Sequence, residues 1–180
     1  MTPLIETDRL IIRFWRREDF APFAALNADA EVMRYFPAPL SRAGSDALAE
    51  KAMKDYEAEG FSYLPVEVKD GARFIGFVGL ARVTAPNPLA GDIEIGWRLA
   101  REAWGKGYAS EAALAWLDFA FEELNPPRVV SFTATANLKS QAVMQRIGLN
   151  RRPDLDFDHP ALPPGDALQR HVVFASDDGG

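Results

Sequence analysis

The sequence predicts an α/β fold in which a mixed β-sheet carries helices on its faces. Short β-branched and aromatic runs alternate with helical patterns, and the early runs are joined by a tight turn that indicates antiparallel pairing. At 180 residues and 48% hydrophobic, the chain is long enough to bury one substantial core. We therefore expect a single domain over residues 1–174, followed by a flexible tail over 175–180.

A strand and two helices are expected first. Residues 10–14 have the β-branched pattern of a strand, and 16–30 follow as a helical stretch with Asp19 as the expected N-cap. A second helix is predicted over 45–59, and Gly60 ends it because glycine adopts the left-handed conformation that closes helices. The side chains expected to face the core from this helix are Leu48, Ala52 and Met53.

The middle of the chain predicts a β-hairpin and a third strand. The runs at 63–68 and 74–80 flank a Lys-Asp-Gly turn at 69–71, which favours antiparallel pairing. A loop rich in proline and glycine at 84–91 then leads to a strand at 92–99.

Helices and strands alternate in the last third. An amphipathic helix follows Gly107 and extends to Leu124, and a β-branched strand is predicted at 129–135. A further helix begins at the Asn-Leu-Lys-Ser sequence of 137–140 and ends at Gly148. Residues 151–165 are rich in proline and aspartate and predict a loop, and 168–174 predicts the final strand.

Composition excludes several classes of protein. The chain has no cysteine, which excludes disulfides and thiolate metal sites. The N-terminal region carries charges inside every apolar stretch, so neither a secretory signal nor a membrane span is predicted, and we expect a soluble, cytoplasmic protein. The formal net charge of −6 opposes binding to nucleic acid. An anionic ligand must therefore be held locally.

A glycine-bearing loop at the start of a helix is the most informative motif. Gly105 and Gly107 let the backbone approach a ligand closely, and the helix that follows offers free N–H groups and the positive end of its dipole. A tight strand-to-helix turn is the purely structural alternative. The spacing matches neither the Walker A loop nor the dinucleotide fingerprint, because the third glycine position of the latter is Ser110. A nucleotide-binding protein is a hypothesis that rests on this loop alone.

The run from Glu102 to Gly107 (EAWGKG) resembles the pyrophosphate loop of the GNAT acyltransferase superfamily, whose pattern is Gln/Arg-x-x-Gly-x-Gly/Ala. The strings at 94–99 (EIGWRL), 104–112 (WGKGYASEA) and 137–149 resemble the RimJ/RimL-like branch of that superfamily, as does the opening of the chain at 6–13. The resemblance spans about residues 6–174. Glu102 departs from the pattern, and we expect its carboxylate to face away from a phosphate.

The resemblance implies a mixed, centrally splayed sheet of about seven strands flanked by helices, with acetyl-CoA between the strands at 92–99 and 129–135. The pantetheine arm would pair with backbone near Trp97, Arg98 and Leu99. Amides from 104–109 would hold the pyrophosphate. The residues expected to bind this co-substrate are Trp97, Arg98, Leu99, Trp104, Gly105, Lys106, Gly107, Tyr108, Ala109, Asn137 and Ser140.

Two residues are the candidate catalytic groups. Glu94 matches a position where relatives carry a general base, and Ser140 matches a serine that can donate a proton to the sulfur of coenzyme A. The structural alternatives are a solvated strand carboxylate or an Arg98 partner for Glu94, and a helix cap for Ser140, a role for which it competes with Asn137. Without cysteine, and with no Ser/His/Asp arrangement, direct acetyl transfer in a ternary complex is expected.

The acceptor is expected to be a primary amine of a small molecule or a protein N-terminus. Asp156, Asp158 and His159 resemble a string that occurs in related sequences and are candidate substrate-binding residues, although an Asp-Pro-rich surface turn explains them equally. No metal site is expected, and a homodimer is possible. The alternative function is a non-catalytic module that binds or senses acyl-CoA.

Overall fold

The computed structural model describes residues 4–71 and 73–176. Its sheet has nine strands in the order β1-β2-β3-β4-β5-β6-β9-β7, with β8 paired to β9. Neighbouring strands are antiparallel except β5 and β6, which are parallel. The strands are β1 (Ile5–Glu6), β2 (Leu10–Ile12), β3 (Tyr63–Val68), β4 (Arg73–Arg82), β5 (Ile93–Leu99), β6 (Val129–Ala134), β7 (Asn150–Arg151), β8 (Phe157–Asp158) and β9 (Arg170–Ala175).

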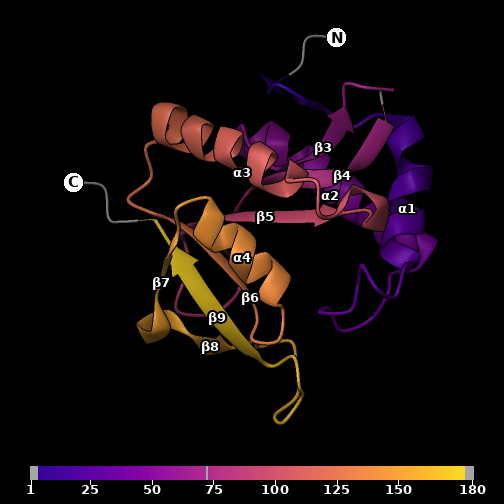
Figure 1. Ribbon diagram of the computed structural model, residues 1–180. Coiled ribbons are helices and arrows are strands. Elements are labelled where there is room, and N and C mark those ends of the chain that lie inside the picture. Colours follow the sequence, from indigo (N-terminus) through magenta and orange to yellow (C-terminus); the bar gives the residue numbers. More distant parts are fainter. Residues whose placement is uncertain (1–3, 72, 177–180) are drawn as a thin grey trace.

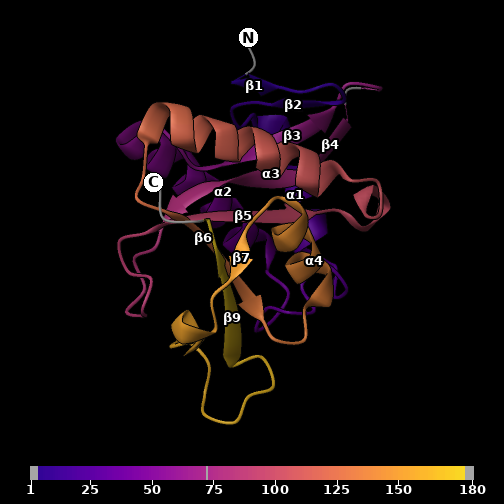
Figure 2. The same cartoon turned by 60° about the vertical axis from the view of Figure 1, so that its left-hand side comes forward.

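The helices cover both faces of the sheet. Figure 2 shows α3 in front of the first five strands, with α1 and α2 behind them. The α-helices are α1 (Phe20–Ala28), α2 (Arg42–Glu59), α3 (Tyr108–Phe119) and α4 (Leu138–Arg146). A π-helical segment, η3 (Ala120–Leu124), continues α3, and short 3₁₀ turns are η1 (Arg17–Asp19), η2 (Arg101–Ala103) and η4 (Pro153–Leu155). The predicted mixed α/β sheet is confirmed.

Several observed elements differ from the predicted ones. Strands β1, β7 and β8 were not predicted, because two-residue strands leave no hydrophobic periodicity to detect. Helix α2 begins at Arg42 because the Ser41 hydroxyl accepts a hydrogen bond from the Gly44 amide. Met53 is 40% exposed instead of facing the core. Strand β9 continues through Ala175, and the predicted tail beyond Ser176 lies outside the described residues.

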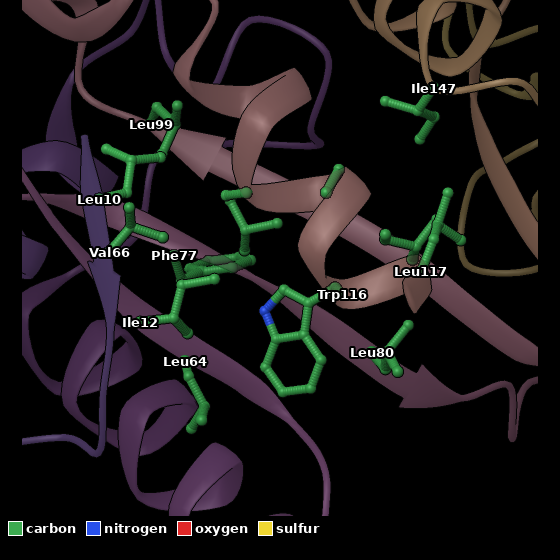
Figure 3. Close-up of a cluster of buried hydrophobic side chains, with 14 of the residues drawn as sticks. Leu10, Ile12, Leu64, Val66, Phe77, Leu80, Leu99, Trp116, Leu117 and Ile147 are labelled. Atoms are coloured by element: carbon green, nitrogen blue, oxygen red, sulfur yellow. The ribbon is translucent and has the colours of Figure 1, made fainter. Parts of the chain in front are cut away.

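One hydrophobic core joins the sheet to the helices. Figure 3 shows Leu10, Ile12 and Val66 of the sheet beside Trp116 of α3. Trp116 is fully buried, as are Leu10 and Ile12 of β2. On the opposite face, Trp15 lies 4.9 Å from Phe23 of α1, measured between ring centroids. Full burial of such side chains contributes about 1.5–3 kcal/mol each, so both helical layers are firmly attached.

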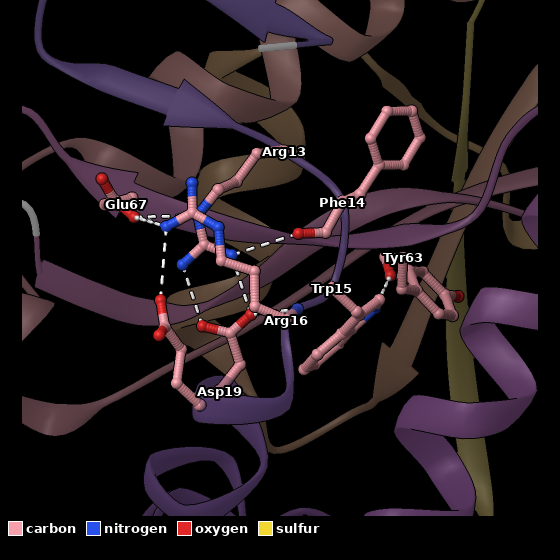
Figure 4. Close-up of polar contacts among 8 residues, drawn as sticks. Arg13, Phe14, Trp15, Arg16, Asp19, Tyr63 and Glu67 are labelled. Atoms are coloured by element: carbon pink, nitrogen blue, oxygen red, sulfur yellow. Dashed lines mark hydrogen bonds and ion pairs between the residues drawn. The ribbon is translucent and has the colours of Figure 1, made fainter. Parts of the chain in front are cut away.

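A buried ion network fixes the connection between β2 and α1. Arg13 is buried and contacts both oxygens of Asp19 at 2.7 and 2.8 Å, while its Nε donates to Glu67 of β3 at 2.8 Å (Figure 4). Asp19 also accepts the Arg16 amide at 2.7 Å. Asp19 is the N-cap residue of α1, as predicted, but its carboxylate binds these groups and makes no capping bond to the helix.

Candidate active site

The parallel ladder between β5 and β6 stops after two residue pairs, Ile93–Val129 and Glu94–Val130, which we call the seam. The Ser131 hydroxyl donates to the Ile95 carbonyl at 2.8 Å. In a regular parallel ladder the next amide, that of Phe132, would bond that carbonyl. Beyond the seam β5 runs straight on, whereas β6 and β9 run obliquely away from it (Figure 1). The sheet thus opens between the ends of β5 and β6.

Backbone groups of β5 face this opening. The Ala100 amide donates to the Ile75 carbonyl, which fixes the alternation of bonds between β4 and β5. By that alternation the polar groups of Arg98 point to β4, and those of Trp97 and Leu99 point to the side of β6. The Leu99 carbonyl accepts the Trp104 indole N–H at 2.8 Å. The backbone N–H and C=O of Trp97 and the N–H of Leu99 therefore remain available to pair with an extended ligand. The backbone groups of Arg98 are not available, because they point to β4, so Arg98 cannot take the backbone role that was expected of it.

The glycine loop presents a run of unpaired amides. Gly105 and Gly107 have φ values of +71° and +80°, which only glycine adopts without strain. Within the described chain, the backbone N–H groups of residues 105–110 have no hydrogen-bond acceptor. Trp104 differs from the prediction, because its amide donates to the Arg101 carbonyl at 3.0 Å. Residues 105–107 are exposed, so the free amides and the start of α3 are accessible to an anion.

Arg9, which precedes β2, holds this loop in place, a contact that no local sequence pattern predicted. Its Nη1 donates to the Lys106 carbonyl at 3.0 Å and its Nε to Glu111 at 2.7 Å. The Thr7 hydroxyl donates to the same carboxylate at 2.6 Å. Partial burial raises the pKa of Glu111, but the hydrogen bonds from Thr7 and Arg9 outweigh it, so the pKa is lowered. The loop is held before any ligand arrives, which reduces the entropy cost of binding.

The other predicted residues of the loop have mixed roles. The Arg9 guanidinium lies 4.8 Å from the centre of the Tyr108 ring, so Tyr108 packs against the arginine that holds the loop. Ala109 is half-buried in the first turn of α3. Lys106 is exposed and follows Gly105 in the loop. Lys139 of α4 lies with its Nζ 4.7 Å from the Trp104 ring, which places a second cation beside the loop.

Asn137 caps α4, which was one of the two expected possibilities. Its Oδ1 accepts the Ser140 amide at 3.3 Å, and its Nδ2 donates to Thr133 at 2.9 Å and to Ser140 Oγ at 3.1 Å. Because Ser140 Oγ accepts this bond, its own hydrogen is free to be donated elsewhere. Ser140 is half-buried in the first turn of α4, the helix that follows β6.

Glu94 lies at the seam and is bonded to Tyr63, a residue that was not predicted. The Tyr63 hydroxyl donates a hydrogen bond to Glu94 Oε1. Gly96 makes this possible, since a Cβ at that position would stand 3.2 Å from the Tyr63 ring. Burial raises the pKa of Glu94, and the bond from Tyr63 opposes that rise without cancelling it. Burial and the Glu94 charge raise the pKa of Tyr63, so it stays protonated.

Glu94 and Tyr63 line a cavity of about 270 Å³ on the face of the sheet that carries α1 and α2. Its walls are mainly aromatic, and its carboxylates other than Glu94 are paired: Asp55 with Lys51 at 2.5 Å and Glu59 with Arg82 at 2.9 Å. The Trp15 indole donates to the Tyr63 carbonyl, which fixes that end of β3 (Figure 4). A mostly apolar pocket with one carboxylate free of any cation is typical of a substrate site.

Asp156, Asp158 and His159 do not line this cavity. Asp156 contacts both terminal nitrogens of Arg151 and accepts the Val173 amide at 3.1 Å. Asp158 lies 3.3 Å from Arg170, and His159 Nδ1 accepts the Ala161 amide. These bonds fasten β8 and its loop to β9. Asp156 thus has structural partners, and substrate binding by Asp156, Asp158 and His159 stays a prediction.

Two negative findings apply to residues 4–71 and 73–176. No cluster of three or more histidine, aspartate or glutamate side chains has an arrangement suited to a metal ion. No helix there combines the length and the hydropathy that crossing a bilayer requires.

The described residues fit acetyl-CoA: the amides of the glycine loop are free, the edge of β5 is unpaired beyond Glu94, and the Glu94 carboxylate lies where the pairing with β6 ends. Residues 9–150 match the acetyltransferase (GNAT) domain family. The chain is 31% identical over 172 residues to the uncharacterized N-acetyltransferase YnaD of Bacillus subtilis, covering 95% of each.

Two further comparisons agree with that match. An acetyltransferase structure from Agrobacterium tumefaciens superposes with a TM-score of 0.78 at 27% identity, covering 97% of this chain and 94% of that one. The FsC-acetyl coenzyme A-N(2)-transacetylase of Aspergillus fumigatus is 38% identical over 96 residues, which cover 51% of this chain and 41% of that protein. This chain belongs to the GNAT acetyltransferase family.

Proposed function

We propose that the protein is an acetyl-CoA-dependent N-acetyltransferase that transfers the acetyl group directly to a primary amine in a ternary complex. The observation that carries this proposal is the position of Glu94. It is the last residue of β5 paired with β6, and its carboxylate lines the cavity on the α1/α2 face. A base therefore stands where the two halves of the sheet part.

The donor side would use backbone groups. Amides of residues 105–110 would bind the diphosphate, assisted by the dipole of α3, and the edge at Trp97 and Leu99 would bind the pantetheine amides. Lys106 and Lys139 add positive charge beside the loop. Acetyl-CoA supplies the acetyl group as an activated thioester. The name of the Aspergillus relative, in which acetyl coenzyme A is the donor, supports the same choice.

The acceptor side needs a neutral amine. At pH 7, removing the proton from a lysine amine costs about 4–5 kcal/mol, against roughly 1–1.5 kcal/mol for an α-amine. Glu94 would receive that proton, and the raised pKa of its carboxyl group makes it a stronger base than a solvated glutamate. The Tyr63 hydroxyl holds the carboxylate in place. Either an N-terminal or a small-molecule amine satisfies this chemistry.

Ser140 would donate a proton to the departing thiolate, because its hydroxyl hydrogen is not used by Asn137. Among the described residues Ser140 has no histidine partner, and the chain has no cysteine. A covalent acetyl-enzyme therefore has no activated nucleophile, which supports direct transfer. Intact-mass spectrometry of the enzyme with acetyl-CoA and no amine tests this, and a gain in mass would contradict it.

The test of the function compares Glu94→Gln with Glu50→Gln, a matched change at an exposed carboxylate of α2. We expect Glu94→Gln to lower kcat/KM for amines by about 10²- to 10⁴-fold, the usual contribution of a general base. Acetyl-CoA binding by calorimetry and the Glu50→Gln rate stay unchanged. Absence of saturable acetyl-CoA binding would overturn the proposal. Binding without acetylation of any amine in a broad panel would favour the non-catalytic acyl-CoA module.

A further inference from the structure

Arg98 is a half-buried cation without an anionic partner. Its Nη1 donates to Asn27 Oδ1 at 2.7 Å, and its Nε is buried without any acceptor. No carboxylate among residues 4–71 and 73–176 lies within 4.0 Å of its guanidinium. Burial lowers the pKa of Arg98 to about 10, so the group is still charged at neutral pH. Nothing in the described chain neutralises that charge.

The surroundings hold the guanidinium rigidly. It lies 4.2 Å from the centre of the Phe36 ring and 5.4 Å from that of Phe77. Asn27 is fully buried, and its Nδ2 donates to Ser45 at 2.9 Å, which directs its oxygen to Arg98. Rings and one amide oxygen orient a cation but do not replace a counter-ion, and a cation removed from water without one is costly.

Arg98 and Glu94 belong to the same face of β5. They are four residues apart on the strand, so their Cα atoms are about 13 Å apart. Gly96 lies between them, and the Tyr63 ring covers it. Tyr63 bonds Glu94 and also interacts electrostatically with Arg98. Phe36, 38% exposed, forms the outer wall beside Arg98. Arg98 does not itself line the cavity, but Phe77, whose ring lies 5.4 Å from the guanidinium, does. A molecule that extends from the cavity past Phe77 would meet the Glu94 carboxylate at one end and the Arg98 guanidinium at the other.

We propose that Arg98 binds a carboxylate of the acceptor, so that the substrates are primary amines carrying a carboxylate several bonds away, such as dipeptides or ω-amino acids. This inference rests on the proposed function, since it places the amine at Glu94. We expect an α-amino acid to be too short, because the Cα atoms of Glu94 and Arg98 are about 13 Å apart and the Tyr63 ring covers the strand between them. The planar guanidinium suits a carboxylate, which it can bind through two parallel hydrogen bonds.

The experiment compares each acceptor with its carboxamide, which keeps the length and the amine but removes the charge. The pairs are glycylglycine with glycylglycinamide, and 4-aminobutyrate with 4-aminobutyramide. For the wild type we expect kcat/KM to be about 10- to 100-fold higher for the carboxylate, the usual effect of one charge-assisted contact. The KM for acetyl-CoA is the same with both members of a pair.

Arg98→Gln then assigns that preference to one residue. We expect it to lose the rate with the carboxylate, to keep the rate with the carboxamide, and so to bring the ratio close to one. Arg42→Gln removes a charge from the exposed pair with Asp46 on α2 and keeps the preference. Thermal unfolding checks that Arg98→Gln is folded, and the wild-type ratio does not depend on that outcome.

Two results would overturn the inference. If the wild type has nearly the same kcat/KM for the carboxylate and for its carboxamide, no cation of the enzyme binds the carboxylate. Acetylation of the carboxamide acceptors would still support the proposed function in that case. An equal loss of both rates in Arg98→Gln would show that Arg98 only supports the Phe36 segment. If no amine is acetylated although acetyl-CoA binds, the proposed function itself fails, and this inference fails with it.

Discussion

Gly107→Ala separates backbone strain from ligand binding, because a matched glycine exists elsewhere in the chain. Gly107 has φ +80°, and Gly91, in the exposed loop before β5, has φ +95°. An L-residue in this left-handed region costs about 1–2 kcal/mol. Both alanine variants are therefore expected to lose similar stability, roughly 2–4 °C in Tm for each kcal/mol in a chain of this length.

Only at Gly107 does the strain reach the free amides. An added Cβ would lie 3.4 Å from Nη2 of Arg9, the residue that holds the Lys106 carbonyl, whereas a Cβ at Gly91 would meet nothing within 4 Å. Relief of the strain turns peptide groups among residues 105–110 away from the anion. Loss of one charge-assisted hydrogen bond costs about 1.5–3 kcal/mol, which weakens acetyl-CoA binding by about 10- to 150-fold.

Calorimetric titration with acetyl-CoA and thermal unfolding of both variants provide the two readouts. We expect Gly91→Ala to bind like the wild type and Gly107→Ala to bind more weakly at a similar loss of Tm. If the two variants bind acetyl-CoA with the same affinity, either that of the wild type or a lower one, the assignment of the diphosphate to this loop is refuted.

Three further changes test the rest of the site and its support. Tyr63→Phe removes the hydrogen bond that lowers the pKa of Glu94 against burial, so the acidic limb of the kcat/KM–pH profile moves to higher pH; an unmoved limb means that Glu94 is not the base. Asp19→Asn removes the charge that compensates the buried Arg13, so we expect the free energy of unfolding in urea to fall by about 3–5 kcal/mol. Arg42→Gln breaks an exposed ion pair and lowers it by under about 1 kcal/mol. Similar losses in the two variants would contradict the role of the network. Asp156 has a lowered pKa: partial burial opposes the shift, but the Arg151 bonds and the Val173 amide outweigh it. Its stabilising effect is therefore present above the unfolded pKa of about 3.9 and is lost as the pH falls through the folded value. Asp156→Asn lowers Tm at pH 7 by more than at pH 3 and leaves kcat/KM unchanged, and an unchanged Tm with a raised KM would restore the predicted substrate role.

The elements that the sequence revealed are those with local patterns. The hairpin of β3 and β4 was predicted because β-branched runs flank a Lys-Asp-Gly turn, and Gly60 ends α2 in the left-handed conformation that a helix C-terminus favours. The glycine loop was predicted because glycines and a helix start are adjacent in the sequence. Its free amides follow from that local order.

What the sequence did not reveal depends on register and long-range contact. Tyr63 meets Glu94 only because β3, β4 and β5 align Tyr63 with Gly79 and Gly96, which no single run of residues encodes. Arg9 reaches Glu111 across more than half of the chain. The partners of Asp156 were not predicted, because a proline-rich loop gives no sign that Arg151 and the Val173 amide will bind its carboxylate.

The shortness of the seam bears on where the chain can change in length. Only two residue pairs join β5 to β6, so the part of the sheet made by β1–β5 and the part made by β6–β9 share a short border. The chain passes from the first part to the second once, through the crossover at residues 100–128, which also carries the glycine loop. An insertion there would displace the amides from the vertex of the sheet. The turn at 84–91, which is largely exposed around the buried Leu89, closes a hairpin, and 159–169 connects β8 to β9, so neither fixes that vertex. We expect homologues to gain or lose residues in those two turns and to keep the crossover constant.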